Sequence, residues 1–280
     1  MAAEHTTAAE AIRTLRARPE MAALIEDSYL DTDSHGYWER FHRSAEFTAV
    51  RRLIGRDTAG LRVLDLGAGV GMAAFAFARS GAAFVCAAEP DSSQEVGYRS
   101  LLGRPPDDLH LSIVEAFGET LPFADETFDL VYCRQVLHHA RHLDRMVSEM
   151  GRVTRRGGQV LACREHVVRN PRDLAKFLQS HPVHAMAGNE HAFRREEYER
   201  AFAGAGLQLR TVLRPLESVI NAYPRARTDE ELAGLPAQWL ARIGAAGRLL
   251  SGAPIVDSCL RGIAVRRAPG SMYTFLASRP

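Results

Sequence analysis

The sequence predicts an α/β protein whose core is a parallel β-sheet. From Leu61 onward, short apolar runs alternate with runs of helical length, and this alternation is typical of strands connected through helices. The best-defined unit is the stretch 63–71, VLDLGAGVG, in which an apolar run enters a glycine turn that precedes the helical run MAAFAFAR. Such a turn lets a ligand approach the backbone closely, because glycine has no Cβ and tolerates positive φ.

The predicted elements follow one another along the chain. Strands are expected at 61–66, 82–91, 109–116, 128–134, 157–168, 207–216 and 272–278. Helices are expected at 72–79, from 92 to about 102, at 135–155, and over 172–206 with a break at Gly188 and Asn189. The helical run 230–250 interrupts the alternation. We therefore expect a helical insertion over about 215–270, before the last strand.

Residues 1–55 form a polar segment that lacks any strand-like run and repeats apolar residues at helical spacing. We expect an N-terminal helical cap here, distinct from a domain over 56–280 that carries the sheet. The cap is either a helical layer packed on the core or a lid over a ligand site, with Tyr37, Trp38 and Arg40 facing inward.

The net charge gives no sign of an overall attraction to polyanions, which leaves local basic patches open. The 280 residues carry 35 basic and 34 acidic side chains, a formal net charge of +1, which gives no case for nucleic acid or anionic membranes as partners. The chain has no apolar run of ~18 residues and no signal-peptide pattern, so we expect a soluble cytoplasmic protein. The cysteines lack CxxC spacing, and three lie in predicted strands, as reduced core residues do. Lys176 is the only lysine, a bias that suggests a high-GC bacterium.

Glu89 and the glycine spacing indicate what the turn binds. Glu89 lies twenty residues beyond Gly69, near the end of the second predicted strand. An acid there can accept hydrogen bonds from both ribose hydroxyls of an adenosine. A dinucleotide fingerprint, GxGxxG, would need glycine or alanine at Met72, and the sequence has GxGxG instead. Asp65 inside the strand suits an ammonium group better than a pyrophosphate.

At these residues the chain resembles the class I S-adenosylmethionine-dependent methyltransferases. VLDLGAGVG resembles the first motif of that family, and Glu89 its ribose-binding acid. GETLPFADETFDLVYCRQVLHH resembles the segment from the adenine pocket through strand four, and RVTRRGGQVL the turn into strand five. The resemblance covers about residues 60–165. It implies a Rossmann-like, doubly wound, mostly parallel seven-stranded sheet with an antiparallel last strand, and S-adenosyl-L-methionine as cofactor.

One position departs from the family pattern. Many relatives carry an aspartate where this chain has Phe117, and here we expect Phe117 to stack on the adenine while the backbone of Gly118 and Glu119 meets the ring nitrogens. The expected cofactor-binding residues are Asp65, Gly67, Ala68, Gly69, Gly71, Glu89, Pro90, Phe117, Gly118, Glu119, Arg134 and Gln135.

The acceptor is expected near histidines at the ends of strands four and five, since ligands bind beyond the carboxyl ends of parallel strands. A histidine among His138, His139 and His166 is expected to act as base or substrate anchor. Expected substrate contacts are Tyr37, Trp38, Glu165, His181, His184 and Asn221. The same imidazoles and carboxylate would suit zinc or iron, but no compact ligand spacing such as HExxH is present, so we expect no metal.

These observations predict a methyltransferase that acts on a small molecule, most simply by O- or N-methylation in specialised metabolism. Two alternatives remain open. One is a protein that binds S-adenosylmethionine without methylating anything. The other is an NAD-dependent oxidoreductase, which the glycine spacing disfavours.

Overall fold

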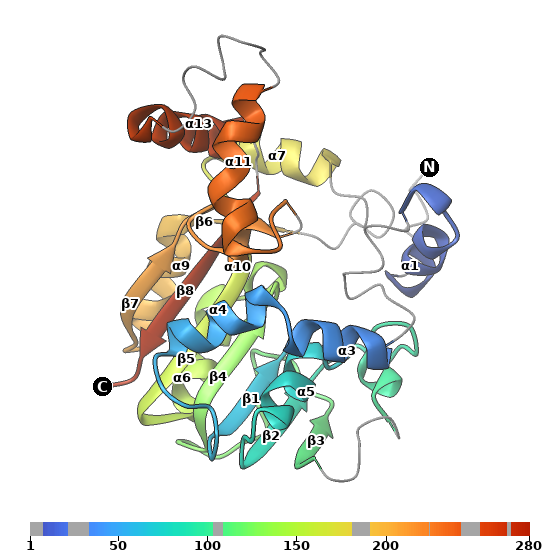
Figure 1. The fold of residues 1–280 in the computed structure, drawn as a ribbon. Coiled ribbons are helices and arrows are strands. Elements are labelled where there is room, and N and C mark those ends of the chain that lie inside the picture. The colour runs from blue at the N-terminus through green and yellow to red at the C-terminus, as the bar shows by residue number, and fades with distance from the viewer. Residues whose placement is uncertain are drawn as a thin grey trace, which may run out of the picture.

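The protein is built around one β-sheet (Figure 1). The computed structural model describes residues 8–21, 34–102, 109–180, 191–223, 225–241, 253–267 and 270–280. The strands are β1 (Arg62–Leu66), β2 (Phe84–Ala88), β3 (Leu111–Val114), β4 (Phe128–Arg134), β5 (Thr154–Val168), β6 (Phe193–Arg194), β7 (Gln208–Leu213) and β8 (Ser271–Ser278).

The strand order is β3-β2-β1-β4-β5-β8-β7. Strands β1 to β5 pair in parallel, whereas β8 runs antiparallel to both β5 and β7. The doubly wound sheet with an antiparallel last strand is therefore confirmed. The chain leaves β1 toward β2 and later returns to its other side with β4, so the switch point lies between β1 and β4, where open α/β sheets bind ligands.

Helices cover both faces of the sheet. On one face, α3 (Ser34–His42), α4 (Ala45–Ile54) and α5 (Met72–Arg79) share an apolar cluster with Val63, which contributes from β1. On the other face, α6 (Leu143–Val153) and α9 (Arg195–Gly204) share a cluster with Leu64 and Leu66. Successive side chains of a strand point to opposite faces, and β1 is buried on both because it lies at the centre of the sheet.

The N-terminal helices pack into the same core as the sheet. Trp38, Phe41 and Phe47 are buried in the cluster that contains α5, and the indole N–H of Trp38 donates to the carbonyl of Val70 (2.7 Å). Further toward the N-terminus lie α1 (Ala8–Arg16) and the 3₁₀ turn η1 (Pro19–Met21). The division of the chain at residue 55 stays a prediction.

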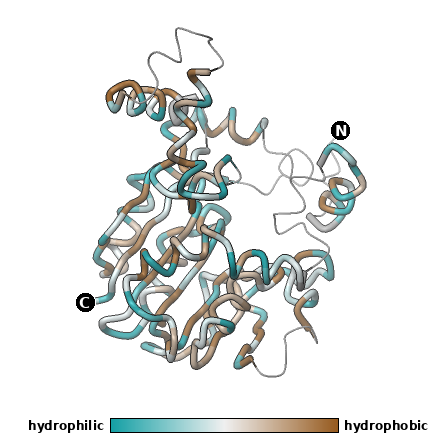
Figure 2. The backbone as a smooth tube through the Cα atoms, viewed as in Figure 1, coloured by the Kyte–Doolittle hydropathy of each residue, from teal (hydrophilic) through white to brown (hydrophobic). Residues whose placement is uncertain are grey.

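The predicted insertion contains helices α10 (Val219–Ala222), α11 (Asp229–Ala241) and α13 (Pro254–Arg267). A separate apolar cluster joins α10 and α11, with Val219, Leu232 and Leu235 buried in it. Both α11 and α13 alternate hydrophobic and hydrophilic residues along their length (Figure 2).

Three expected helices differ in the structure. After β2 only the 3₁₀ turn η2 (Tyr98–Ser100) forms, because Asp91 folds the chain into a loop by accepting from the backbone N–H groups of Tyr98 and Ser93. The helix expected at 135–155 begins only at Leu143 and is preceded by the 3₁₀ turn η3 (Leu137–His139), since Gln135 has a positive φ of 59°. Within 172–206 the chain forms α7 (Pro171–Ser180), the short strand β6 and then α9; the expected break at 188–189 lies outside the described residues.

Candidate active site

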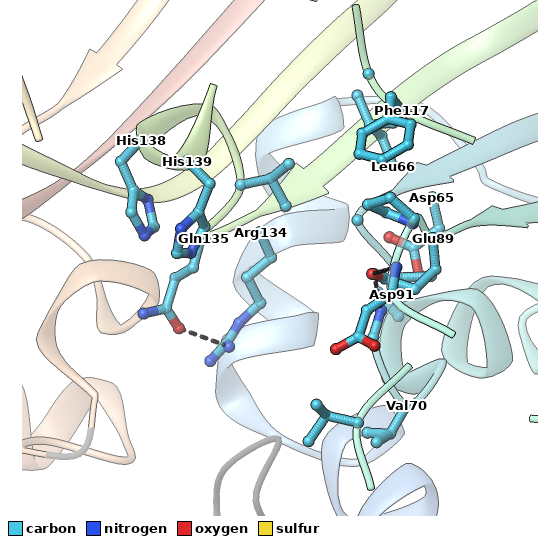
Figure 3. Close-up of a pocket in the computed structure, with 18 of the residues that line it drawn as sticks. Asp65, Leu66, Val70, Glu89, Asp91, Phe117, Arg134, Gln135, His138 and His139 are labelled. Atoms are coloured by element: carbon cyan, nitrogen blue, oxygen red, sulfur yellow. Dashed lines mark hydrogen bonds between the residues drawn. The ribbon is translucent and has the colours of Figure 1, made fainter. Parts of the chain in front are cut away.

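A cavity of about 560 Å³ lies at the carboxyl ends of the central strands. Figure 3 shows its two sides, with Asp65, Glu89, Asp91 and Phe117 on one and Arg134, Gln135, His138 and His139 on the other. The predicted cofactor and catalytic residues that line it are Asp65, Gly67, Ala68, Gly69, Glu89, Pro90, Phe117, Gly118, Glu119, Arg134, Gln135, His138, His139 and His166. Gly71 is not among the lining residues.

The turn after β1 requires glycine at more than one position. Gly67, Gly69 and Gly71 have φ values of 65°, 51° and 78°, a left-handed conformation that other residues adopt only at a cost. A Cβ on Gly67 would lie 2.4 Å from Cγ2 of Val136, and one on Gly71 would lie 2.5 Å from Cδ2 of Leu101. The loop therefore packs tightly against Val136 and Leu101, while Gly67 and Gly69 line the cavity.

Asp65 holds the start of α5. Its Oδ2 accepts from the backbone N–H of Ala74 (2.8 Å), one of the donors that a helix N-terminus leaves without an intrahelical partner. Burial raises the pKa of Asp65 to about 7, and the bond from Ala74 opposes that rise. The carboxyl is therefore poised between its neutral and charged forms near neutral pH.

We expect the contribution of Asp65 to the free energy of unfolding to fall as pH rises from about 4 to about 7. In that window Asp65 is ionised in the unfolded chain, where its pKa is near 3.8, but holds its proton in the folded one, where its pKa is about 7. The folded state then binds more protons than the unfolded state, so raising the pH disfavours it, by on the order of 4 kcal/mol for a shift of this size. Urea unfolding across this range should show a shallower decline for Asp65→Asn than for the parent protein. An equal decline would contradict the assignment.

Glu89 links the glycine turn to the segment that follows β2. Its Oε2 accepts from the N–H of Gly69 (2.8 Å) and its Oε1 from the N–H of Asp91 (2.9 Å). Burial raises the pKa of Glu89, while these two N–H groups act against the rise. The sequence prediction did not include Asp91, which lines the cavity and could have been found from its place two residues beyond Glu89.

Phe117 lies at one side of the cavity and is 55% exposed although it is large and hydrophobic. An exposed aromatic face in a ligand cavity can stack on a flat ring. Beside it, the Glu119 side chain accepts from the N–H of Arg141 (3.0 Å). The side chain of Glu119 therefore holds the segment between η3 and α6, and the backbone of Gly118 and Glu119 lines the cavity.

Arg134 lines the cavity and forms a buried ion pair with Glu46 of α4. Its Nε and Nη2 donate to the two carboxylate oxygens of Glu46 (2.8 and 3.1 Å), and its Nη1 donates to Oε1 of Gln135 (3.1 Å; Figure 3). Burial lowers the pKa of Arg134, but the pairing with Glu46 outweighs burial and raises it overall. The sequence prediction missed Glu46, because no local pattern marks a partner so distant in the chain.

Three imidazoles meet at the side of the cavity formed by η3 and β5. The ring centroids of His138 and His139 lie 4.2 Å apart, and those of His138 and His166 lie 4.7 Å apart. Nδ1 of His138 faces Oε2 of Glu165 at 2.9 Å, and Nδ1 of His166 faces the carbonyl oxygen of Gly270 at 2.7 Å.

The predicted substrate contacts divide between the cavity and the protein interior. Tyr37 lines the cavity. Trp38, Glu165 and Asn221 are buried and not among its lining residues; Asn221 bonds the carbonyls of Leu213 and Arg214 and the hydroxyl of Thr274, which fixes α10 to the sheet. His181 and His184 lie outside the described residues. Within the described residues no group of three metal-ligating side chains converges, and the expectation of no metal stays a prediction.

A family model described as a methyltransferase domain matches residues 64–162. This match spans β1 to the middle of β5, including the glycine turn, Glu89 and η3. Residues 64–162 therefore belong to the methyltransferase domain family. The cofactor of this methyltransferase is S-adenosylmethionine.

Curated relatives match a part of the chain. A ubiquinone biosynthesis O-methyltransferase from Agrobacterium fabrum is 29% identical over 158 residues, 55% of this chain and 62% of that protein. A demethylmenaquinone methyltransferase from Clavibacter sepedonicus is 37% identical over 105 residues, 38% of this chain and 41% of that protein. The chain thus covers less than two thirds of the length of these relatives.

Solved structures share the fold. An S-adenosylmethionine-dependent methyltransferase from Mesorhizobium loti aligns with a TM-score of 0.57 and 17% identity, covering 86% of this chain and 100% of that one. A geranyl diphosphate methyltransferase in complex with its cofactor aligns with a TM-score of 0.54 and 19% identity, covering 89% of this chain and 93% of that one.

The side chains present fit S-adenosylmethionine. Near the glycine turn the cavity offers the carboxylates of Asp65 and Glu89, which suit an ammonium group and ribose hydroxyls, and the exposed ring of Phe117 lies where an adenine could stack. The absence of side chains at Gly67 and Gly69 leaves the backbone accessible to the ligand.

Proposed function

We propose that this methyltransferase transfers a methyl group from S-adenosylmethionine to a small-molecule acceptor, by O- or N-methylation. One observation carries the proposal: a single cavity combines a set of groups suited to the cofactor with a cluster of three histidines. Methyl transfer needs donor and acceptor held in line, and a shared cavity supplies that proximity.

Each group has a task in this mechanism. Asp65 and the backbone of 67–71 would orient the amino-acid end of the cofactor, Glu89 would accept from the ribose hydroxyls, and Phe117 would stack on the adenine. Bound S-adenosylmethionine supplies an electrophilic methyl group. A histidine at the opposite side then holds the acceptor or removes its proton, an effect of roughly 10²- to 10⁴-fold on rate.

The name of one relative supports an oxygen acceptor. The Agrobacterium fabrum relative is named for O-methylation in ubiquinone biosynthesis, and the match spans 55% of this chain. The acceptor of the present protein is accordingly proposed as a small metabolite, in specialised metabolism.

The proposed partners include neither nucleic acid nor membrane, because the formal net charge of +1 gives no attraction to polyanions. The cytoplasm is the proposed location. No helix among the described residues combines the length and apolarity needed to cross a bilayer.

Glu89→Ala is expected to weaken S-adenosylmethionine binding strongly. The substitution removes the ribose acceptor and releases the N–H groups of Gly69 and Asp91; loss of hydrogen bonds to a charged group costs about 1.5–3 kcal/mol, or roughly ten- to a hundredfold in Kd. Isothermal titration calorimetry with S-adenosylmethionine and S-adenosylhomocysteine measures the change.

Glu115→Ala is the matched control, because Glu115 directly follows β3 as Glu89 follows β2, yet it is exposed and not among the lining residues. Unchanged binding by Glu89→Ala, or no binding by the parent protein, would refute the proposed site. Binding without transfer of a radiolabelled methyl group to a broad acceptor panel would instead favour a non-methylating role.

A further inference from the structure

Glu165 is a fully buried carboxylate that contacts His138. We infer that Glu165 is a positioning residue that sets His138 as the general base, and that the acceptor is therefore a hydroxyl compound. The inference rests on the proposed function and deepens it, because it selects one of three histidines and one class of acceptor.

The carboxylate of Glu165 is held from several directions. Oε2 faces Nδ1 of His138 (2.9 Å) and accepts from the backbone N–H of the same residue (3.1 Å), while Oε1 accepts from the N–H of Val136 (3.0 Å). Burial raises the pKa of Glu165, and the backbone N–H groups of residues 136–138 oppose the rise by stabilising its charged form. A carboxylate surrounded by donors in this way is suited to accept the ring N–H as well.

This contact fixes which nitrogen of His138 carries the proton. A carboxylate accepts hydrogen bonds, so the ring places its N–H on Nδ1, and the neutral imidazole then has its lone pair on Nε2. The His138 ring lines the cavity. When Nε2 takes a proton, the carboxylate stabilises the resulting imidazolium, as the buried acid of a hydrolytic triad does for its histidine.

The partner at Nδ1 distinguishes His138 from His166. His166 faces a neutral carbonyl, that of Gly270, in place of a carboxylate. Titratable groups near the His138–Glu165 pair, among the described residues, include His139 on η3, His166 and Cys163 on β5, Tyr198 on α9 and Cys133 on β4, whose Sγ lies 3.9 Å from Oε1 of Glu165. The negative charge in contact with the His138 ring comes from Glu165.

A base of this kind favours a hydroxyl acceptor. A neutral amine attacks through its own lone pair without first losing a proton, whereas a hydroxyl becomes a strong nucleophile as its proton leaves. In the proposed step the acceptor oxygen forms a bond to the methyl carbon, the carbon–sulfur bond breaks with its electron pair left on sulfur, and the hydroxyl proton moves to Nε2 of His138.

The first test is ¹⁵N-histidine NMR on the full chain saturated with S-adenosylhomocysteine, with the His138 signals assigned from their loss in His138→Gln. The expected neutral ring carries its proton on Nδ1, and Glu165→Gln lowers the midpoint pH of His138 protonation by about one unit or more, because the stabilising charge is gone. Glu149→Gln is the matched control: Glu149 also accepts a backbone N–H, that of Leu121, and pairs with Arg152, but does not line the cavity.

A neutral His138 ring protonated on Nε2, or a midpoint unchanged by Glu165→Gln, would overturn the inference. The tautomer of the parent protein decides the matter even where Glu165→Gln does not fold. S-adenosylhomocysteine binding is measured on every protein, so that loss of binding, which bears on the proposed function, is separated from loss of the base.

The second test is turnover of a matched pair of probes, 4-nitrocatechol and 4-nitrobenzene-1,2-diamine. We expect transfer to the catechol, a kcat lowered roughly 10²- to 10⁴-fold in His138→Gln, and an acid limb of the kcat/KM profile moved to lower pH in Glu165→Gln. Transfer to the diamine alone overturns the hydroxyl assignment. Transfer to neither probe counts against the proposed function and leaves the NMR result to decide the base.

Discussion

Gly67→Ala is expected to bind S-adenosylmethionine at least about tenfold more weakly than the parent protein. Gly67 has a φ of 65°, a conformation that costs other residues about 1–2 kcal/mol. The added Cβ would also lie 2.4 Å from Cγ2 of Val136, closer than nonbonded carbons approach. Val136 also lines the cavity, so relief of the clash, by movement of the loop or of Val136, changes the cavity wall.

The affinity for S-adenosylmethionine falls because the strained loop itself lines the proposed cofactor site. Displacing residue 67 shifts the N–H groups of 67 and 68, which donate to the carbonyl of Ala88 (2.8 and 3.1 Å) and hold the turn against β2. Each 1.4 kcal/mol needed to return the loop to its binding conformation weakens affinity about tenfold. Isothermal titration calorimetry with S-adenosylmethionine measures this change.

Gly60→Ala separates the effect of backbone strain from the effect of a steric clash. Gly60 also has a left-handed φ, 76°, but a Cβ there would meet no atom within 4 Å, and Gly60 does not line the cavity. We expect this variant to lose stability, by about 1–2 kcal/mol, with cofactor affinity unchanged. Equal affinity in Gly67→Ala and the parent protein would show that the turn tolerates a side chain and that its glycines do not shape the site.

The difference between these two glycines is not visible in the sequence. A glycine run between an apolar strand and a helix is a local pattern, so the sheet, the turn and the cavity-lining residues next to it were predictable from periodicity and spacing. That Val136 lies against Gly67 depends on strand order, because β4 is the neighbour of β1 only in the folded sheet. Local patterns do not encode such contacts.

The acceptor side shows the same limit more strongly. The pattern predicts histidines at the ends of β4 and β5, and His138, His139 and His166 do line one cavity. The pairing of His138 with Glu165 joins residues 27 apart, and that of Arg134 with Glu46 joins residues 88 apart. The 3₁₀ turn that orients His138 was expected to be helix, since the positive φ of Gln135 is unusual for that residue type.

The pairing of Glu46 with Arg134 supports the second prediction: Glu46→Leu is expected to destabilise the protein by about 3–5 kcal/mol. Glu46 is 5% exposed and Arg134 12% exposed, and two hydrogen bonds join them. Removing one partner leaves the other as an uncompensated buried charge, which costs more than the pair itself contributes. Urea unfolding, followed by circular dichroism, gives the change in the free energy of unfolding.

The double variant Glu46→Leu, Arg134→Met separates a buried charge from lost packing. If the charge left on Arg134 is the cause, its removal restores much of the lost stability, because apolar replacements of a whole buried pair are often neutral. Asp229→Asn, which removes one partner of the exposed Arg52–Asp229 pair on α4 and α11, should change stability by less than about 1 kcal/mol. A double variant no more stable than Glu46→Leu would instead assign the cost to packing between α4 and β4, and Arg134 would then line the cavity without depending on Glu46 for its charge balance.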